Sequence, residues 1–198
     1  MQRLWILLTL AGRGALTSLL TGVIFWWLPG GSAAAGEAPA VDQAPMQELQ
    51  LAIAVPLREG VRPIFVTGER PHFHVVLTNR GQATVRLWTQ TCSWGYQALR
   101  FEAVDAAGKV VEIGRRPQQF LQNAPTTYAL EAGDCVVFDI YFAGDDWQGF
   151  KLPAKGQTMS TRLRAIYEVP ADKQTQQHNV WTGKVESPLG EYRFESRR

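Results

Sequence analysis

Apolar and polar residues alternate one by one through much of this chain, and this period limits the possible folds more than any other feature. The clearest example begins at Phe73, where Phe73, Val75 and Leu77 are apolar while His74 and Thr78 occupy positions of opposite parity. A two-residue period is typical of a β-strand with one buried face. We therefore predict an all-β fold.

A turn follows this first stretch directly. The sequence Asn-Arg-Gly at 79–81 contains two residues that tolerate the positive φ angles of a tight connection. The alternation then resumes at 84–88. We predict that 73–78 and 84–88 pair with each other as a β-hairpin.

The same pattern recurs along the rest of the chain, and a second hairpin is expected from 98–105 to 110–113. The other predicted strands are 49–57, 64–67, 135–142, 162–168, 180–186 and 192–195. Stretches without the alternation are predicted as loops, namely 114–125, 144–157 and 170–179. No amphipathic helix is expected after residue 47. Short strands separated by turns at this spacing favour an Ig-like antiparallel β-sandwich over a barrel.

The N-terminal segment resembles an export signal. It is apolar as far as residue 28 apart from a few positions, and Arg13 lies near its middle. A charge at the centre of a spanning helix costs about 2.5–3.5 kcal/mol, so we interpret the part up to Arg13 as a positive n-region. Small residues at 32–36 then offer a cleavage site. An uncleaved N-terminal membrane anchor is the alternative.

These boundaries divide the chain into three parts. We predict a signal peptide or anchor helix over 1–35, a flexible linker over 36–47 and the Ig-like domain over 48–198. The domain is expected to be exported, either as a periplasmic or secreted protein or as one held at the inner membrane by its N-terminal segment.

The charge balance limits the class of partner. The chain carries 20 basic and 18 acidic residues, and its formal charge of +2 arises from Arg3 and Arg13 in the N-terminal segment. The domain itself is therefore neutral, which argues against nucleic acid or an anionic membrane surface as its partner. Contact with a membrane is expected only through the N-terminal segment, if that segment is uncleaved.

Cys92 and Cys135 are the only two cysteines. Export brings a chain into an oxidising compartment, where such a pair usually forms a bridge, so we predict a disulfide between them. Two inert reduced thiols are the alternative. The chain has no Cys-X-X-Cys spacing that would indicate a redox site.

No pattern in the chain points to catalysis or to a bound cofactor. His72 and His74 could ligate zinc, but the only other histidine is His178, far along the chain, so solvent-facing histidines are the simpler interpretation. The acidic pair Asp145–Asp146 lacks the alternating oxygen ligands of a calcium loop. The serines lack a Gly-X-Ser-X-Gly context, and no phosphate-binding loop is present. We predict a protein that is not an enzyme and that holds no cofactor or metal.

Aromatic and arginine side chains in the predicted loops are the candidates for a binding site. Such residue types are enriched in binding hot spots, and flat aromatic rings also bind sugars. We predict an exposed binding surface at one end of the sandwich, formed by Trp94, Tyr96, Arg115, Arg116 and Trp147. Packing in the core is the alternative for Trp94 and Trp147. Trp88 and Trp181 are expected in the core.

Several motifs between 69 and 142 resemble a bacterial Ig-like domain of the intracellular proteinase inhibitor type. They are Leu-Thr-Asn-Arg-Gly at 77–81, Leu-Arg-Phe-Glu-Ala-Val-Asp at 99–105, Gly-Lys at 108–109, a middle loop that reaches Phe120, and Leu-Glu-Ala-Gly-Asp at 130–134. The ending Val-Trp-Thr-Gly-Lys-Val-Glu-Ser at 180–187 is similar to the last strands of exported bacterial Ig-like proteins. The resemblance implies an Ig-like fold and, as a possible activity, protease inhibition.

The function predicted from these features is that of an exported, non-catalytic binding module with a protein or glycan partner in the cell envelope. Two alternatives stay open. One is a protease inhibitor that presents the loop 114–125, and the other is a carbohydrate-binding module that uses the loop aromatics.

Overall fold

The computed structural model describes residues 48–66, 72–105, 107–142 and 146–196. Within these residues the chain forms twelve strands and two five-residue helices, which confirms the prediction of an all-β fold. The predicted signal or anchor over 1–35 and the linker over 36–47 lie outside the described residues.

One layer of the domain is a three-stranded antiparallel sheet with the order β1-β3-β8. Its strands are β1 (Leu49–Ala54), β3 (Phe73–Asn79) and β8 (Cys135–Ile140). Because β1 is an edge strand, Pro56 just after it removes no ladder donor from a central position.

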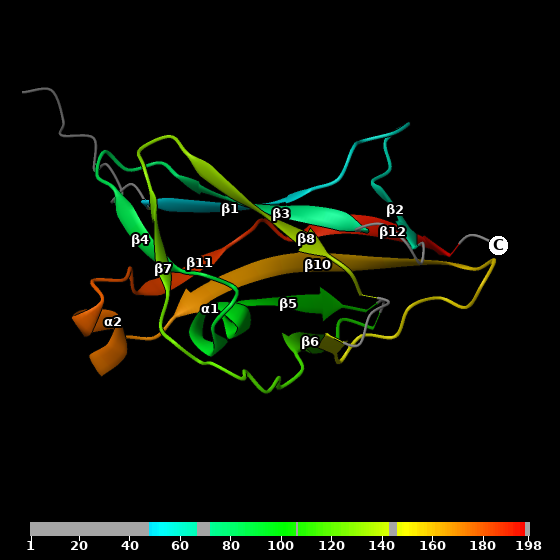
Figure 1. Ribbon diagram of the computed structural model, residues 1–198. Coiled ribbons are helices and arrows are strands. Elements are labelled where there is room, and N and C mark those ends of the chain that lie inside the picture. Colours follow the sequence, from blue (N-terminus) through cyan, green and yellow to red (C-terminus); the bar gives the residue numbers. More distant parts are fainter. Residues whose placement is uncertain (1–47, 67–71, 106, 143–145, 197–198) are drawn as a thin grey trace, which may run out of the picture. The chain divides into compact units, whose positions relative to one another are not determined.

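The second layer is a seven-stranded sheet built around the long strand β10. Figure 1 shows β10 running alongside β1 and β3. The order of the sheet is β2 (Pro63–Val66), β12 (Gly190–Ser196), β10 (Thr158–Val169), β5 (Leu99–Val104), β6 (Val110–Arg115) and β9 (Trp147–Gln148), and β11 (Gly183–Glu186) also pairs with β10. The predicted β5–β6 hairpin is confirmed. The prediction of uniformly antiparallel pairing is wrong at β2, which runs parallel to β12.

The core lies between these two sheets. Alternate residues of β5 are buried, and β1, β3 and β8 bury alternate residues along part of their length. Phe73 of β3 meets Phe101 of β5 edge-to-face at 5.7 Å between ring centroids, and Phe138 of β8 lies 6.0 Å from Tyr167 of β10. Aromatic contacts of this kind add stability beyond the area that they bury.

The predicted hairpin between 73–78 and 84–88 is wrong. Strand β4 (Val85–Trp88) pairs with β7 (Thr127–Leu130) in a separate two-stranded sheet, and β3 pairs with β1 and β8 instead. The fully buried Asn79 at the end of β3 explains the departure. Its amide nitrogen donates to the carbonyls of Ala83 and Leu130, so the chain after β3 is fastened to the β4–β7 ribbon.

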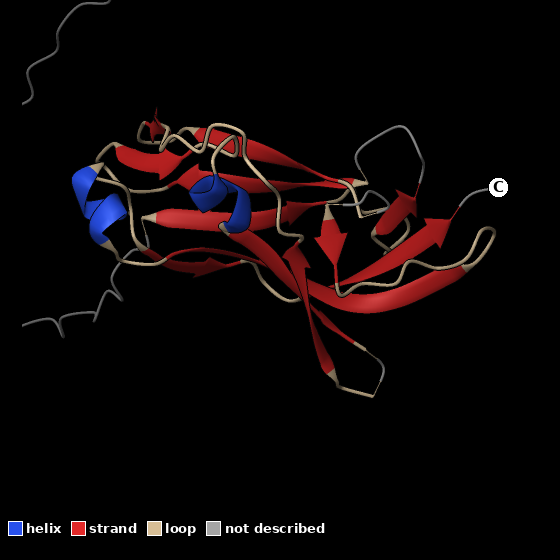
Figure 2. Cartoon of the chain, turned by 60° about the horizontal axis from the view of Figure 1, so that its bottom comes forward, coloured by secondary structure: helices blue, strands red, loops and turns tan. Residues whose placement is uncertain are grey.

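Two segments predicted as connections are helical. Helix α1 (Ser93–Gln97) follows β4, and helix α2 (Lys173–Gln177) interrupts the predicted loop 170–179. Each is too short to show a helical period in its sequence. Figure 2 shows both helices in the half of the domain away from the C-terminus.

The two neighbouring histidines differ in their surroundings, so the interpretation of both as solvent-facing is wrong. His72 is 8% exposed, stacks on Tyr141 and accepts a hydrogen bond from the Phe142 amide at its Nδ1. His74 is exposed, and its Nδ1 lies 2.9 Å from the Asp139 carboxylate on the next strand.

The cysteines are two free thiols, so the predicted disulfide is not formed in this structure. Cys92 is fully buried beside Thr89 and Thr126, at one end of the β4–β7 ribbon. Cys135 is exposed and begins β8, beyond the turn that leaves the other end of the ribbon at Leu130. A bridge needs Cα atoms within about 7 Å, whereas a four-residue strand separates the two ends.

Candidate functional site

The structure brings together four of the five residues predicted to bind a partner, but it packs three of them internally. The guanidinium of Arg115, at the end of β6, lies 4.9 Å from the Tyr96 ring centroid and 4.1 Å from the Trp147 ring centroid. The fourth, Arg116, donates from its Nε to the Trp147 carbonyl at 3.1 Å.

This stack is buried, so the predicted exposed surface is wrong for most of its members. Tyr96 is 9% exposed and Trp147 is 4% exposed, and Trp147 packs in the core against both Phe101 and Phe142. Burial also lowers the pKa of Arg115 below its usual range, although Tyr96 and Asp146 act in the opposite direction. Arg116 and Trp94 remain accessible, and their role in binding stays a prediction.

Trp94 belongs to a different cluster. Its ring stacks on Trp88 with 5.6 Å between centroids, and Trp88 meets His178 edge-on at 5.4 Å. Trp88 is 2% exposed, as predicted for a core residue, whereas Trp94 is half-buried. The indole pair therefore joins β4, α1 and the end of α2.

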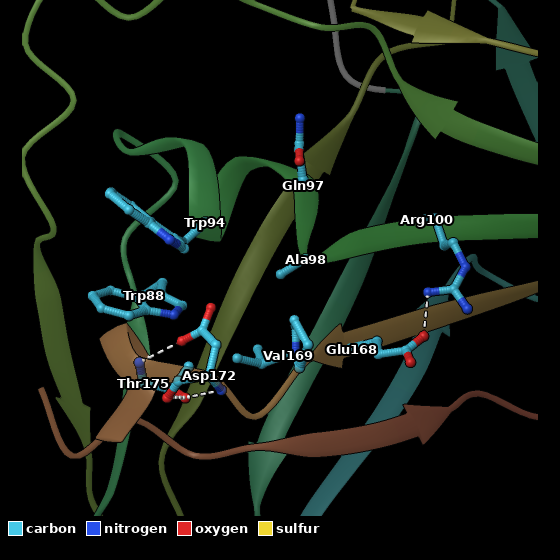
Figure 3. A pocket seen from close by; sticks show the side chains of 10 residues that line it. Trp88, Trp94, Gln97, Ala98, Arg100, Glu168, Val169, Asp172 and Thr175 are labelled. Carbon is cyan, nitrogen blue, oxygen red and sulfur yellow. Dashed lines mark hydrogen bonds and ion pairs between the residues drawn. The ribbon is translucent and has the colours of Figure 1, made fainter. Parts of the chain in front are cut away.

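A pocket of about 290 Å³ opens beside this pair. Figure 3 shows the indoles on one side of it and the Arg100–Glu168 pair on the other. Its wall consists of Trp88, Trp94, Gln97, Ala98, Arg100, Glu168, Val169, Pro170, Asp172 and Thr175. Four separate segments therefore build the site: β4, the α1–β5 junction, the end of β10 and the start of α2.

The position of Trp94 depends on Gly95. A side chain at Gly95 would place its Cβ 2.0 Å from the Thr89 carbonyl oxygen, so only glycine allows α1 to approach the end of β4 this closely. The turn of α1 is held by the Tyr96 amide, which donates a hydrogen bond to the Cys92 carbonyl at 2.9 Å.

The part of the wall beside Trp88 depends on a reciprocal cap of α2. The Thr175 amide donates to Asp172 Oδ1 at 2.8 Å, and the Asp172 amide donates to the Thr175 hydroxyl at 2.9 Å. The cap thereby satisfies two of the backbone donors at the start of the helix. The spacing Asp-Lys-Gln-Thr at 172–175 is a recognisable capping signal, and the prediction of a polar loop there overlooks it.

The residues around the pocket combine satisfied and unsatisfied polar groups. Arg100 pairs with Glu168 at 2.6 Å, and Asp172 uses one carboxylate oxygen for the cap. The Trp88 Nε1 is buried without a hydrogen-bond partner in the described part of the chain. Such a site can hold a small group by contact with the aromatic wall and by hydrogen bonds at the rim.

Metal binding has no support among the described residues, where no group of three or more His, Cys, Asp or Glu side chains is arranged to hold an ion. Neither helix in the part of the chain that the structure describes has the length and apolar character needed to cross a bilayer.

Comparison with known proteins assigns no family to the chain. No protein-family model matches it, and no curated protein resembles it in sequence.

Proposed function

We propose that this chain is an exported, non-catalytic binding module with an Ig-like sandwich fold, and that it captures its partner at the Trp88–Trp94 pocket. The observation that carries the proposal is the stacked indole pair beside an open pocket with a charged rim. Indole side chains supply a large contact area at little cost in conformational entropy, so they dominate many binding sites. The partner belongs to the cell envelope.

Several features support the pocket as a binding surface over the loop surface predicted from the sequence. Tyr96, Arg115 and Trp147 contact each other, whereas the pocket presents Trp94 and the polar groups of its rim to solvent. Its volume is at the lower end of the range for ligand sites, roughly 300–1,000 Å³. A single sugar residue or one side chain of a partner fits this size.

The test is capture of envelope components by the purified domain, with bound protein and bound glycan analysed separately. Trp94→Ala removes the accessible indole, and Gln97→Trp fills the pocket from an exposed rim position. We expect both variants to lose capture while their melting temperatures stay near that of the parent. Arg116→Ala serves as the control, since Arg116 is exposed but lies outside the pocket. Loss of capture only in Arg116→Ala would move the site to the loop surface.

A protease inhibitor is a second candidate, and one observation favours it. Leu121 is fully exposed in the loop between β6 and β7. The loop is anchored on both sides of it, because Phe120 packs edge-on against Tyr96 at 5.7 Å and Asn123 exchanges two hydrogen bonds with Ser93. A rigid loop with one protruding apolar side chain suits the primary pocket of a protease that cleaves after large apolar residues.

Incubation with chymotrypsin-like, elastase-like and subtilisin-like proteases tests this second candidate. An inhibitor would block one of them, and Leu121→Gly would lose that inhibition by tenfold or more, a change of about 1.4 kcal/mol. Leu189→Gly is the matched control, since Leu189 is also exposed but lies far along the chain. Rapid cutting of the loop without inhibition would remove the candidate.

A further inference from the structure

The Trp88 indole nitrogen is an unsatisfied polar group beside the pocket. It is a hydrogen-bond donor with no partner in the described residues, in a side chain that is 2% exposed. In Figure 3 the nitrogen-bearing end of Trp88 is turned toward the side on which Val169 and Asp172 lie. Buried donors are nearly always paired. This one is covered, so a ligand in the pocket meets the Trp94 ring and the polar groups of the rim rather than the nitrogen itself.

Acceptors also lie at the rim. Asp172 accepts the capping hydrogen bond of α2 at Oδ1, and its second oxygen has no hydrogen-bond partner in the part of the chain that is described. Gln97, exposed at the top of the pocket, offers both an amide donor and a carbonyl acceptor. Donors and acceptors are therefore mixed around one apolar wall.

The rim carries charges of both signs, and the Arg100 guanidinium is already paired with the Glu168 carboxylate at 2.6 Å. A cation would meet Arg100 at one end of the pocket and Asp172 at the other. An anion would meet Glu168 and Asp172. A neutral ligand with several hydroxyl groups can donate to the carboxylates and accept from the indole and amide N–H groups.

We propose that the pocket binds one neutral saccharide residue of a glycan, packed against Trp94 and hydrogen-bonded at Asp172 and Gln97. The inference rests on the proposed function and names its ligand class. A ring with apolar C–H groups on one side and hydroxyls around its edge matches the wall and the rim of this pocket, and its size suits a volume of about 290 Å³.

The experiment is calorimetric titration of the protein with maltotriose, cellotriose, chitotriose and xylotriose. Tetramethylammonium, glucuronate and N-acetyl-glycyl-glycine amide serve as cationic, anionic and peptide-like probes. We expect at least one trisaccharide to bind and the other three probes to fail. Binding should be insensitive to salt, since no ion pair forms with the ligand. Trp94→Ala should weaken the saccharide affinity at least tenfold.

Asp172→Asn gives the sharpest variant, because asparagine caps helices as well as aspartate does and so preserves α2. A saccharide should bind this variant no more than about tenfold more weakly, since the amide still accepts a hydrogen bond. A cation would lose its binding entirely. Trp181→Phe is the control, since it removes an indole that does not line this pocket.

The outcomes separate the two proposals. Binding of tetramethylammonium or the peptide probe, with no saccharide bound, would overturn the saccharide inference and leave the binding module standing. The saccharide inference is equally overturned if envelope capture depends on Trp94 but the captured material is protein alone. If the pocket variants change neither saccharide binding nor envelope capture, both proposals are wrong.

Discussion

Arg115 stacks on Trp147, with its guanidinium carbon 4.1 Å from the ring centroid, and the same carbon lies 4.9 Å from the Tyr96 ring centroid. Only 9% of the arginine side chain is exposed. A guanidinium is flat and weakly hydrated, so it can fill a gap between two rings that an ammonium group would leave poorly packed. Arg115 therefore fastens α1 to β6 and β9.

Replacement of Arg115 should consequently affect stability and leave ligand binding unchanged. We expect Arg115→Ala to lower the free energy of unfolding by about 2–4 kcal/mol, since the contacts with both rings are lost. Arg115→Lys keeps the charge but not the planar stack, and about half of that loss is expected. Urea unfolding measures both values. A stable Arg115→Ala variant that no longer captures its partner would instead assign Arg115 to the binding site.

Asn79 offers a second test, because one buried amide serves three backbone groups. Its nitrogen donates to the carbonyls of Ala83 and Leu130, and its oxygen accepts from the Gly81 amide at 2.9 Å. Asn79→Ala leaves these groups without their partner, and a loss of about 3 kcal/mol in unfolding free energy is expected. Thr78→Ala, on the preceding residue of β3, is the control and should cost less than about 1 kcal/mol. Equal effects in urea unfolding would contradict the role given to Asn79.

Asn79 also shows how far the sequence predicts this fold. Alternation identifies a strand and the face that it buries, so most of the predicted strands lie close to the observed positions. Alternation does not identify the partner of a strand, because every strand with one buried face has the same period. The Asn-Arg-Gly turn after β3 predicts a hairpin, whereas side-chain bonds from Asn79 to residues as distant as Leu130 direct the chain to another sheet.

A pair of glycines tests how α1 is placed against the end of β4. Gly95→Ala would force a Cβ to within 2.0 Å of the Thr89 carbonyl oxygen, whereas the Cβ of Gly114→Ala meets nothing within 4 Å. We expect the first substitution to cost more than about 3 kcal/mol and the second to stay within about 0.5 kcal/mol. Circular dichroism melting compares them. If the two variants have the same melting temperature, the close approach of α1 to Thr89 is wrong.

The alkaline limit of stability should reflect buried tyrosines. Burial raises the pKa of Tyr128 to about 12, and burial first, with Tyr128 as a neighbour, raises the pKa of Tyr167 further. An unfolded tyrosine titrates near 10, so above that pH the unfolded state binds fewer protons than the folded state. Stability is therefore unaffected below about pH 10 and falls between about 10 and 12, by about 1.4 kcal/mol per pH unit for each tyrosine. Urea unfolding at a series of pH values measures this fall. In Tyr128→Phe the fall per pH unit should be smaller by the contribution of one tyrosine, and an unchanged fall would contradict the role given to Tyr128.

The sequence predicts the candidate site less well than the fold, for a physical reason. Residue type identifies Trp94 and Trp147 as aromatic, but exposure depends on what packs against each ring. Trp147 lies against Phe101 of β5, far from it in sequence, and against Phe142, which shortly precedes it in the chain. Trp94 stacks on Trp88 and keeps an accessible side. Only contacts between distant segments make this distinction.

The cysteines provide the last test, since a bridge and two thiols differ in reactivity and in stability. Cys135 is exposed, whereas Cys92 is fully buried and donates to the Thr89 carbonyl at 3.2 Å. In protein purified without reductant, one cysteine thiol should therefore react rapidly with an aromatic disulfide reagent. The second thiol should react only when the protein is unfolded. Cys135→Ser should change the unfolding free energy by less than about 0.5 kcal/mol, because an exposed position tolerates the exchange. If the pair were bridged, no thiol would react before reduction, and the same substitution would cost about 2–5 kcal/mol through the lost cross-link.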